Sequence, residues 1–406
     1  MSITTTTELV TLIPHGEILL SFAPMYKQEL LDNILPFWLA NSKDEKNGGY
    51  FTCLNREGKV YDTDKFMWLQ GREVWCFSFM YNNIEQKTEW LDMALHGAKF
   101  MQKFGRNENG DWYFSLTSDG KPLIQPYNIF SDCFATMAFA ALDKATPNEV
   151  YKKIALDTFE NIIRRQHNWK GKYSKTYAGT RALKNFSLPM ILCNLSLELE
   201  HIIGKGRVDS FIPTVINEVM DVFYQPELGL ILENVYEDGS FCDSFEGRLL
   251  NPGHAIEAMW FIMDLGKRMD DEQLIKKACK IMLDTIEYGW DKEFGGIFYF
   301  LDVIGNPPQQ LEWDQKLWWV HVESLVALAK GYAYTKDENC AKWFKKIHDY
   351  TWSHFKDTEH GEWFGYLNRR GEVLLDAKGG KWKGCFHIPR SLYLVWKTLE
   401  GLKIEG

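Results

Sequence analysis

Two histidines occupy similar positions in apolar segments that lie far apart in the chain. His254 lies in "NPGHAIEAMW" (251–260), and His387 lies in "KGCFHIPR" (383–390). A lone histidine on an apolar face is more often a hydrogen-bonded core residue than a catalyst. Imidazole titrates at about pH 6.5, so two such rings facing one cavity could remove a proton from carbon and return one. The pair therefore predicts an epimerisation.

Polar residues also begin the other segments that have helical spacing. Glu257 follows His254 by three positions and shares its helical face, where it could orient the ring, hold a sugar hydroxyl or make a surface contact. Asp132 and Asn185 are interpreted as ordinary helix caps. The polar residues near these helix starts are Arg72, Asn128, Asp132, Asn185, His254, Glu257, His321, Glu323, His387 and Arg390.

A glycine repeat indicates how these helix starts are positioned. Five segments place two glycines ten residues apart around alternating apolar positions, as in "GGYFTCLNREG" and "GEWFGYLNRRG", which is typical of a short β-hairpin. A sixth, less regular copy begins at Gly171 in "GKYSKTYAGTRAL". The copies begin at 48, 110, 171, 229, 295 and 361, so each repeat has room for two helices.

Apolar residues at spacings of three and four predict those two helices in every repeat. The predicted helices span 21–40, 65–83, 88–104, 128–143, 147–167, 186–203, 208–224, 252–268, 272–290, 316–335, 339–356 and 385–402. Six helix pairs can bury their apolar faces by closing into an inner and an outer ring, whereas an open solenoid would need polar capping repeats.

The sequence therefore predicts an all-α (α/α)6 barrel with short β-hairpins at one end. Residues 21–406 are expected to form this single catalytic domain, after an N-terminal extension at 1–20. Each hairpin leads into the next helix, so six helix starts share one end of the barrel. Their unpaired N–H groups and partial positive charge favour a ligand there.

Composition and charge narrow the classes of ligand. The net charge of −9 argues against a nucleic-acid surface, which needs clustered Lys and Arg. Sixteen Trp offer flat faces that suit sugar rings, although most Trp residues belong to cores. We expect no membrane span and no signal peptide, and we interpret the eight scattered Cys as reduced thiols in a cytoplasm.

Metal and phosphate-loop patterns are missing from the sequence. It contains no HExxH, no CxxC pair and no EF-hand spacing, so no metal is predicted. The stretch "GGKWKG" (379–384) lacks the Walker pattern and is interpreted as a glycine-rich hairpin edge. A basic stretch from Arg164 to Lys184 is interpreted as a solvated loop, with an anion site as the alternative.

These segments resemble the N-acylglucosamine 2-epimerase family, whose animal member is also known as renin-binding protein. The resemblance covers nearly everything after residue 25. Its most specific segments are "GGYFTCLNREGKVYDTDKFMWLQGREVW", "QPYNIFSDCFA", "FEGRLLNPGHAIEAMWF", "QLEWDQKLWWVHVESLVAL", "GEWFGYLNRRGEVL" and "KGGKWKGCFHIPR". The resemblance implies an (α/α)6 barrel and interconversion of N-acetylglucosamine and N-acetylmannosamine by inversion at C2.

The resemblance also implies roles for individual residues. His254 and His387 match the two family histidines that remove and return the C2 proton of the open-chain sugar. Arg72, in "QGREVW", is the first candidate to stabilise the charge that develops on O1. Of Glu257 and Trp382, one is expected to orient and the other to stack. The full set of expected substrate contacts is Arg72, Asn128, Glu246, Arg248, Glu257, Trp318, Glu323 and Trp382.

A nucleotide activator and a homodimer follow from the same resemblance. Members of this subgroup are activated by ATP without hydrolysing it, which implies a nucleotide site without a Walker loop. Lys175 and Arg181 are the expected nucleotide contacts. Disaccharide-acting relatives carry additional histidines in the sixth helix, whereas "PMILCNLSLELE" (189–200) has none, which favours a monosaccharide substrate.

Three other functions remain open at this point. The first is another monosaccharide enzyme on the same scaffold, either a 2-epimerase of a different monosaccharide or an aldose–ketose isomerase. The isomerase would share both histidines but would move the proton from C2 to C1. A glycoside hydrolase would need a carboxylate pair, for which Glu246 and Glu257 are candidates. The third alternative is a protein-binding role without catalysis.

Overall fold

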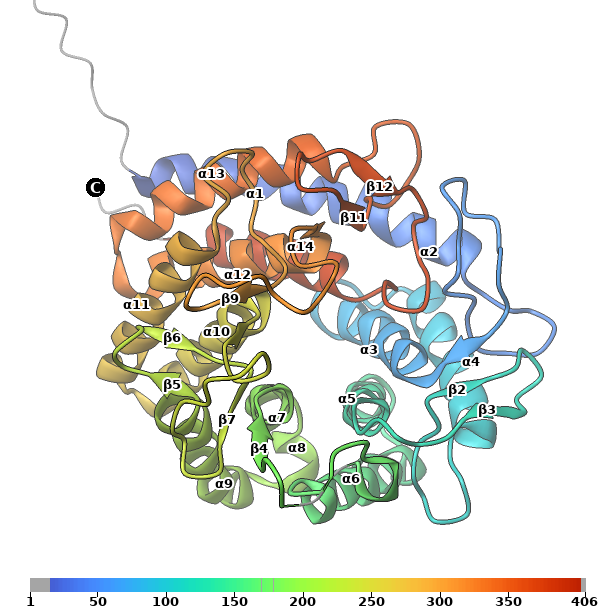
Figure 1. Cartoon of the computed structure of the whole chain (residues 1–406). Coiled ribbons are helices and arrows are strands. Elements are labelled where there is room, and N and C mark those ends of the chain that lie inside the picture. The colour runs from blue at the N-terminus through green and yellow to red at the C-terminus, as the bar shows by residue number, and fades with distance from the viewer. Residues whose placement is uncertain (1–14, 169, 178, 403–406) are drawn as a thin grey trace, which may run out of the picture.

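The computed structural model describes residues 15–168, 170–177 and 179–402, which form a closed ring of helices (Figure 1). The helices are α1 (His15–Glu29), α2 (Leu35–Asn41), α3 (Met67–Asn83), α4 (Thr88–Phe104), α5 (Phe130–Ala145), α6 (Glu149–Arg165), α7 (Ser187–Glu198), α8 (Glu200–Ile203), α9 (Lys205–Asn217), α10 (Pro252–Met269), α11 (Glu272–Gly289), α12 (Trp318–Thr335), α13 (Glu338–His354) and α14 (His387–Glu400). Two π-helical segments, Leu30–Ile34 and Glu218–Val222, follow α1 and α9. The predicted (α/α)6 barrel is confirmed.

The inner ring consists of α3, α5, α7, α10, α12 and α14, each packed against the next in this order. Protein surrounds these helices, so α5 is buried without a break from Ser131 to Leu142. The ring closes between α14 and α3, because the Phe386 ring, just before α14, packs on Trp75 of α3 at 5.1 Å. Residues at the two ends of the sequence therefore share one core.

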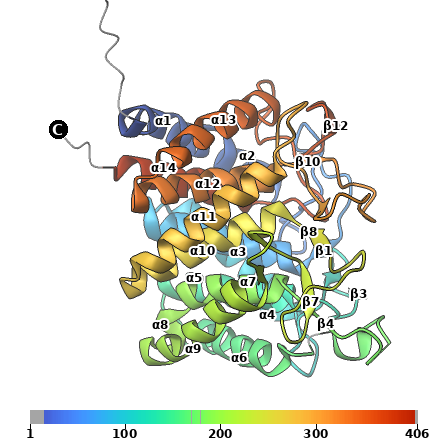
Figure 2. The same ribbon diagram turned by 60° about the vertical axis from the view of Figure 1, so that its left-hand side comes forward.

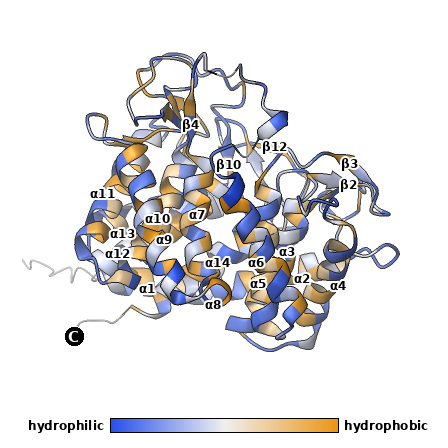
Figure 3. Cartoon of the chain, turned by 90° about the horizontal axis from the view of Figure 1, so that it is seen from below, coloured by the Kyte–Doolittle hydropathy of each residue, from blue (hydrophilic) through white to orange (hydrophobic). Residues whose placement is uncertain are grey.

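The outer ring consists of amphipathic helices that cover the inner ones. Helix α11 packs on α10 and α12, α13 packs on α12, and α1 packs on α14 and α13. In α11 the buried residues recur at helical spacing, whereas Lys276 and Lys280 face solvent. Figure 3 shows the hydrophobic and hydrophilic residues that alternate along these helices.

Short strands gather at the end of the ring where the inner helices begin (Figure 2). They are β1 (Lys65–Phe66), β2 (Ser115–Leu116), β3 (Pro122–Ile124), β4 (Leu183–Asn185), β5 (Tyr224–Gln225), β6 (Leu230–Ile231), β7 (Asn234–Tyr236), β8 (Leu249–Leu250), β9 (Leu301–Asp302), β10 (Lys316–Leu317), β11 (Tyr366–Leu367) and β12 (Val373–Leu375). Their short length matches the predicted hairpins.

The strands tie each inner helix to the following repeat. The strand that precedes an inner helix pairs antiparallel with a later strand in four places: β1 with β2, β4 with β7, β8 with β9, and β10 with β11. Lys378 and Gly379 complete the circle by donating backbone hydrogen bonds to the carbonyl of Leu54. The starts of the inner helices are therefore held relative to one another.

The glycine repeat has a conformational cause. The second glycine of five copies has a φ between +83° and +90°, a region that side chains with a Cβ avoid: Gly58, Gly120, Gly239, Gly305 and Gly371. The hairpin predicted at 171 is wrong, because Gly171–Tyr173 form a 3₁₀ turn and no strand lies among the described residues from 171 to 182. None of the described residues from 171 to 182 is buried, so this copy does not pack on the core.

The helical ring begins earlier than the expected domain boundary at residue 21. Helix α1 begins at His15, and Leu19 is buried in the main core. Residues 1–14 of the expected extension lie outside the described residues. In the described part of the chain, none of the helices has both the length and the apolar character needed to cross a membrane.

Candidate active site

A cavity of about 490 Å³ opens among the first turns of the inner helices, at the strand end of the ring. All six inner helices or the residues just before them contribute to it. The lining residues are Trp68, Arg72, Asn128, Phe130, Phe134, Ser187, Met190, Ile191, Asn194, His254, Glu257, Tyr299, Glu312, Gln315, Leu317, Trp318, Trp319, Tyr366, Trp382, Phe386, His387 and Arg390. Aromatic rings dominate, which suits the apolar faces of a sugar.

His254 is held in the first turn of α10 by two hydrogen bonds. Asn251 caps the helix by accepting from the backbone N–H of His254 at 3.2 Å. The ring Nδ1 donates to Glu233 Oε1 at 2.9 Å, since a carboxylate can only accept. Burial lowers the pKa of His254, but the charge and hydrogen bond of Glu233 outweigh burial and leave that pKa above its ordinary value. Protonated His254 is therefore suited to donate a proton from Nε2.

His387 begins α14 and faces the same cavity with the opposite electrostatic bias. Its Nδ1 donates to Glu323 Oε1 at 2.8 Å. Burial, together with the positive charge of Arg72, lowers the pKa of His387 well below its ordinary value. Neutral His387 therefore presents Nε2 as a base. The Trp319 ring contacts both imidazoles, with its centroid 5.3 Å from that of His254 and 5.8 Å from that of His387.

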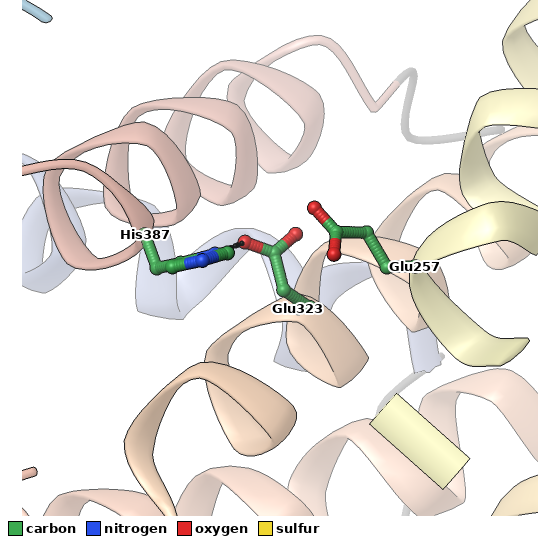
Figure 4. Close-up of side chains that lie close together, drawn as sticks. All are labelled: Glu257, Glu323 and His387. Atoms are coloured by element: carbon green, nitrogen blue, oxygen red, sulfur yellow. Dashed lines mark hydrogen bonds and ion pairs between the residues drawn. The ribbon is translucent and has the colours of Figure 1, made fainter. Parts of the chain in front are cut away.

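Glu323, Glu257 and His387 form a buried cluster (Figure 4). Ligand-type atoms of these three residues lie within 4.8 Å of one another, a geometry that could suit a metal ion. The guanidinium of Arg390, however, donates through Nη2 to both Glu257 and Glu323. A bound cation would have to compete with this guanidinium, so the cluster fits a paired arginine better than a metal.

Arg72 lies on α3 as a buried cation without a carboxylate partner at hydrogen-bond distance among the described residues. Its guanidinium carbon lies 4.5 Å from the ring centroid of Trp68, 4.1 Å from that of Phe134 and 4.7 Å from that of Phe386. Its Nε is buried without a hydrogen-bond partner. Burial lowers the pKa of Arg72 to about 9. Such a group can receive negative charge that develops on a ligand.

Three further predicted contacts also line the cavity. Asn128 accepts a hydrogen bond from the backbone N–H of Phe130 at 2.7 Å and so shapes the entry to α5. Trp318 is buried with an unpaired indole N–H. Trp382 is 51% exposed and packs beside Trp68, with ring centroids 5.7 Å apart. Its position at the cavity mouth fits stacking rather than orientation.

Five predicted residues are not among those that line the cavity: Glu246, Arg248, Glu323, Lys175 and Arg181. Arg248 is bound to Asp302 at 2.9 Å and to Asp243, which ties β8 to β9. Glu246 and Arg181 both lie on outer loops. Their exposed side chains form an ion pair at 3.1 Å. Lys175 is exposed on the loop after the 3₁₀ turn. Glu246 and Arg248 therefore do not line this cavity, and the substrate contacts predicted for them remain predictions.

The remaining polar residues at helix starts have structural partners. His321 is buried, accepts from the backbone N–H of Ile297 and donates to the carbonyl of Leu317. Asn185 ends β4 and accepts from the backbone N–H of Ser187 at 3.2 Å, whereas the N-cap position of α7 is Phe186. Asp132 instead accepts from Asn161 and Arg165, and burial raises its pKa to about 7.

Sequence reasoning missed Glu233, Trp319 and Trp68. Glu233 lies between β6 and β7, and no fixed spacing links it to His254. Its backbone donates to Leu249 and accepts from Phe186, which fixes it between β8 and the start of α7. Only the position of Glu233 inside a glycine repeat, "GLILENVYEDG", could have drawn attention to it.

Comparison with known proteins identifies the family. The model of the N-acylglucosamine 2-epimerase family matches residues 49–389. The N-acylglucosamine 2-epimerase of Mus musculus is 38% identical over 392 residues, covering 92% of this chain and 91% of the mouse protein. The Homo sapiens enzyme of the same name is also 38% identical, with 92% and 89% covered. The chain belongs to the N-acylglucosamine 2-epimerase family.

Solved structures agree with the fold of this epimerase. Cellobiose 2-epimerase from Bacillus thermoamylovorans B4167 superposes with a TM-score of 0.80 at 21% identity, covering 93% of this chain and 99% of that one. A D-mannose isomerase superposes with a TM-score of 0.77 at 18% identity, covering 93% and 98%. These likenesses establish the barrel, and the family membership establishes an isomerase of the epimerase type.

Proposed function

We propose that this enzyme interconverts N-acetyl-D-glucosamine and N-acetyl-D-mannosamine through the open-chain sugar. The observation that carries the proposal is the pair of imidazoles in one cavity, each with Nδ1 bound to a carboxylate and with pKa values displaced in opposite directions. The relatives named N-acylglucosamine 2-epimerase supply the substrate class.

Proton transfer at C2 uses the two rings in different states. The C1 aldehyde of the open-chain sugar acidifies the C2–H bond. Neutral His387 takes this proton on Nε2, and protonated His254 delivers its own proton from Nε2 to the opposite face of C2. The two rings then hold the states required for the reverse direction, and exchange with solvent restores the starting states. Inversion follows because the two protons lie on opposite faces.

The electrons left by the C2 proton move onto O1 as an enolate. We assign this charge to Arg72, because its buried Nε has no partner in the described part of the molecule and, unlike Arg390, it has no carboxylate there at hydrogen-bond distance. Preorganised donors of this kind are worth about 10²–10³-fold in rate. Glu257 is held by Arg390, which leaves its other oxygen for a sugar hydroxyl. Trp382 stacks at the mouth.

Isotope exchange tests the proposed function. The enzyme is incubated with N-acetyl-D-glucosamine in deuterated water, and the products are resolved by NMR. We expect N-acetyl-D-mannosamine that carries deuterium at C2. A ketose product would instead support the aldose–ketose isomerase, because the proton would then arrive at C1.

The carboxylate pair predicted for a hydrolase does not meet in this cavity, because only Glu257 of the two lines it. Glu246 is exposed outside the cavity, whereas Glu257 is buried and bound to Arg390. A hydrolase pair needs its two carboxyl groups within about 10 Å across one bond. Release of reducing sugar from an oligosaccharide by a variant that lacks both His254 and His387 would support the hydrolase.

We further propose that ATP activates the enzyme without being hydrolysed, through the exposed loop that carries Lys175 and Arg181. Arg181 is paired with Glu246 on this surface, so a phosphate would have to replace that carboxylate. Replacing both basic residues with Gln should raise the ATP concentration needed for activation. Unchanged activation would place the nucleotide elsewhere.

We also propose that the protein is a homodimer located in the cytoplasm. All eight cysteines are free and buried, which suits a reducing compartment. Sedimentation equilibrium should give twice the chain mass of 47.4 kDa. A monomer at working concentration would contradict the dimer.

A further inference from the structure

We infer that the α7 side of the cavity seats the N-acyl group and sets the preference for 2-acylamino sugars over 2-hydroxy sugars. The inference rests on the proposed function, because it takes C2 as the reacting carbon. Four residues of α7 line the cavity at helical spacing: Ser187, Met190, Ile191 and Asn194. They form one face of the helix, directed at the ligand.

Charge is distributed unevenly around the cavity. The charged lining residues and both histidines come from α3, α10, α14 and the connection between β9 and β10, which carries Glu312, whereas the lining residues from α5 and α7 are uncharged in the described structure. An acyl amide is neutral and half apolar, so the uncharged wall fits it better. Helix α7 packs directly against α10, which carries His254. A substituent on C2 therefore reaches α7 while C2 stays beside the imidazole.

Asn194 is a buried amide with a poor partner. It is 3% exposed, and its Nδ2 donates to the thioether of Met137 at 3.6 Å, a weak acceptor. Its Oδ1 accepts no hydrogen bond from the described residues. Burying an amide without good partners is costly, so the site gains when a ligand supplies them. An acyl N–H can donate to Oδ1, and an acyl carbonyl can accept from Nδ2.

Met190 and Ile191 provide the apolar part of the seat. Both are buried and lie about one turn before Asn194 on the same face. Residues four apart in a helix are about 6 Å apart along its axis, so Met190 and Asn194 can contact the two ends of one acetamido group, through van der Waals contact and hydrogen bonds respectively. The acyl methyl can therefore contact Met190 while the amide reaches Asn194. A hydroxyl at C2 offers neither contact, and it leaves the buried amide underpaired.

Ligand binding without turnover tests the seat. Calorimetry gives the dissociation constants of N-acetylglucosaminitol and glucitol, two reduced open-chain sugars that differ in the acylamino group. For Asn194→Leu we expect the preference for the N-acetyl compound to fall by at least about tenfold. The control is Ser196→Ala on the same helix, where the hydroxyl donates to Leu192 away from the cavity. That control should keep the wild-type preference.

Equal weakening of both ligands by Asn194→Leu would overturn the inference, because it would indicate a structural role. An unchanged preference would overturn it as well. Wild-type turnover of N-acetylglucosamine is measured in parallel. If that turnover is missing while Asn194→Leu still lowers the preference for the N-acetyl compound, the proposed function is wrong but the inferred binding site for the N-acyl group is supported.

A second variant tests the apolar half independently of how well Asn194→Leu folds. Met190→Ala removes side-chain volume where the acyl methyl would lie. We expect it to improve binding of N-butanoylglucosaminitol relative to N-acetylglucosaminitol by at least about fivefold, because the longer acyl chain fills the space. Thermal unfolding confirms that the variant is folded. A ratio equal to that of the wild type would place the acyl group elsewhere.

Discussion

Glu233 lies 2.9 Å from Nδ1 of His254, although it belongs to the connection between β6 and β7 rather than to α10. The carboxylate is 7% exposed and its backbone is bonded to β8. It therefore fixes the ring tautomer and supports the protonated ring, while Nε2 stays directed at the cavity. Glu233 is a positioning residue, since it acts on the substrate through His254.

Replacing Glu233 with Gln should move the alkaline limb of the pH–rate profile. The carboxylate holds the pKa of His254 above its ordinary value, so its removal lowers that pKa. Because the protonated His254 ring is the proton donor, the active form of the enzyme is lost at a lower pH in the variant. We expect the limb for N-acetylglucosamine to shift down by about one pH unit.

The matched control for this variant is Glu237→Gln, a glutamate just after β7 that is exposed to solvent. It should leave the profile in place. A lower rate for Glu233→Gln with an unshifted profile would mean that the carboxylate only shapes the loop.

Removing one histidine at a time should separate exchange from inversion. In His254→Asn, neutral His387 remains and can take and return the C2 proton on one face. We expect deuterium to enter C2 of one epimer without inversion, and no exchange in the other. In His387→Asn, only the opposite epimer should exchange.

NMR of each sugar in deuterated water measures this exchange. His201→Asn is the control, because His201 bonds the carbonyl of Ala140 outside the cavity. Exchange of both epimers by either single variant would contradict the assignment of one histidine to each face.

Arg72→Gln should lower kcat/KM without lowering stability. The guanidinium is buried with an unpaired Nε, so its loss removes a costly charge from the folded state. We expect kcat/KM to fall by about 10²–10³-fold while the unfolding midpoint stays level or rises. Steady-state kinetics and thermal unfolding check the two parts. Retained activity would remove Arg72 from the site.

Asp291→Asn should destabilise the ring. Asp291 is 2% exposed and accepts from Lys316 at 3.1 Å and from Arg369 at 3.0 Å. Neutralising it leaves the Lys316 ammonium buried without its counter-charge. We expect the free energy of unfolding, measured with denaturant, to fall by about 3 kcal/mol. The exposed pair of Asp284 and Lys280 is the control, and Asp284→Asn should cost less than about 1 kcal/mol.

The ring of helix pairs could be predicted because its causes are local. The second glycine of each regular copy marks a turn that needs positive φ, and apolar spacing marks the helices between the turns. The copy that begins at Gly171 has Arg181 where the other copies have their second glycine, and a 3₁₀ turn forms at Gly171–Tyr173 instead of a hairpin. The sequence predicted the first helix from residue 21, whereas α1 begins at His15. Local spacing did not reveal this start, because Leu19 is buried by helices that are distant in the sequence.

The site was predictable where family motifs and helix starts coincide. His254, His387 and Arg72 stand in such motifs, and the helices bring them to one cavity. Arg248 stands in a motif as well, but it serves the strand pair β8–β9, so motif membership did not separate ligand contact from scaffold. Glu233 was missed because its link to His254 depends on how two strand connections meet in space.

Closure of the ring through α14 has a consequence for biosynthesis. The proton donor, His254 with its partner Glu233, is complete within the first two-thirds of the chain. The base, His387, belongs to α14, the sixth inner helix, and the charge of Arg72 on α3, the first inner helix, lowers the pKa of this base. A nascent polypeptide on the ribosome, or a product of premature termination before this helix, would carry half a reaction centre. Catalysis therefore requires that translation has passed α14.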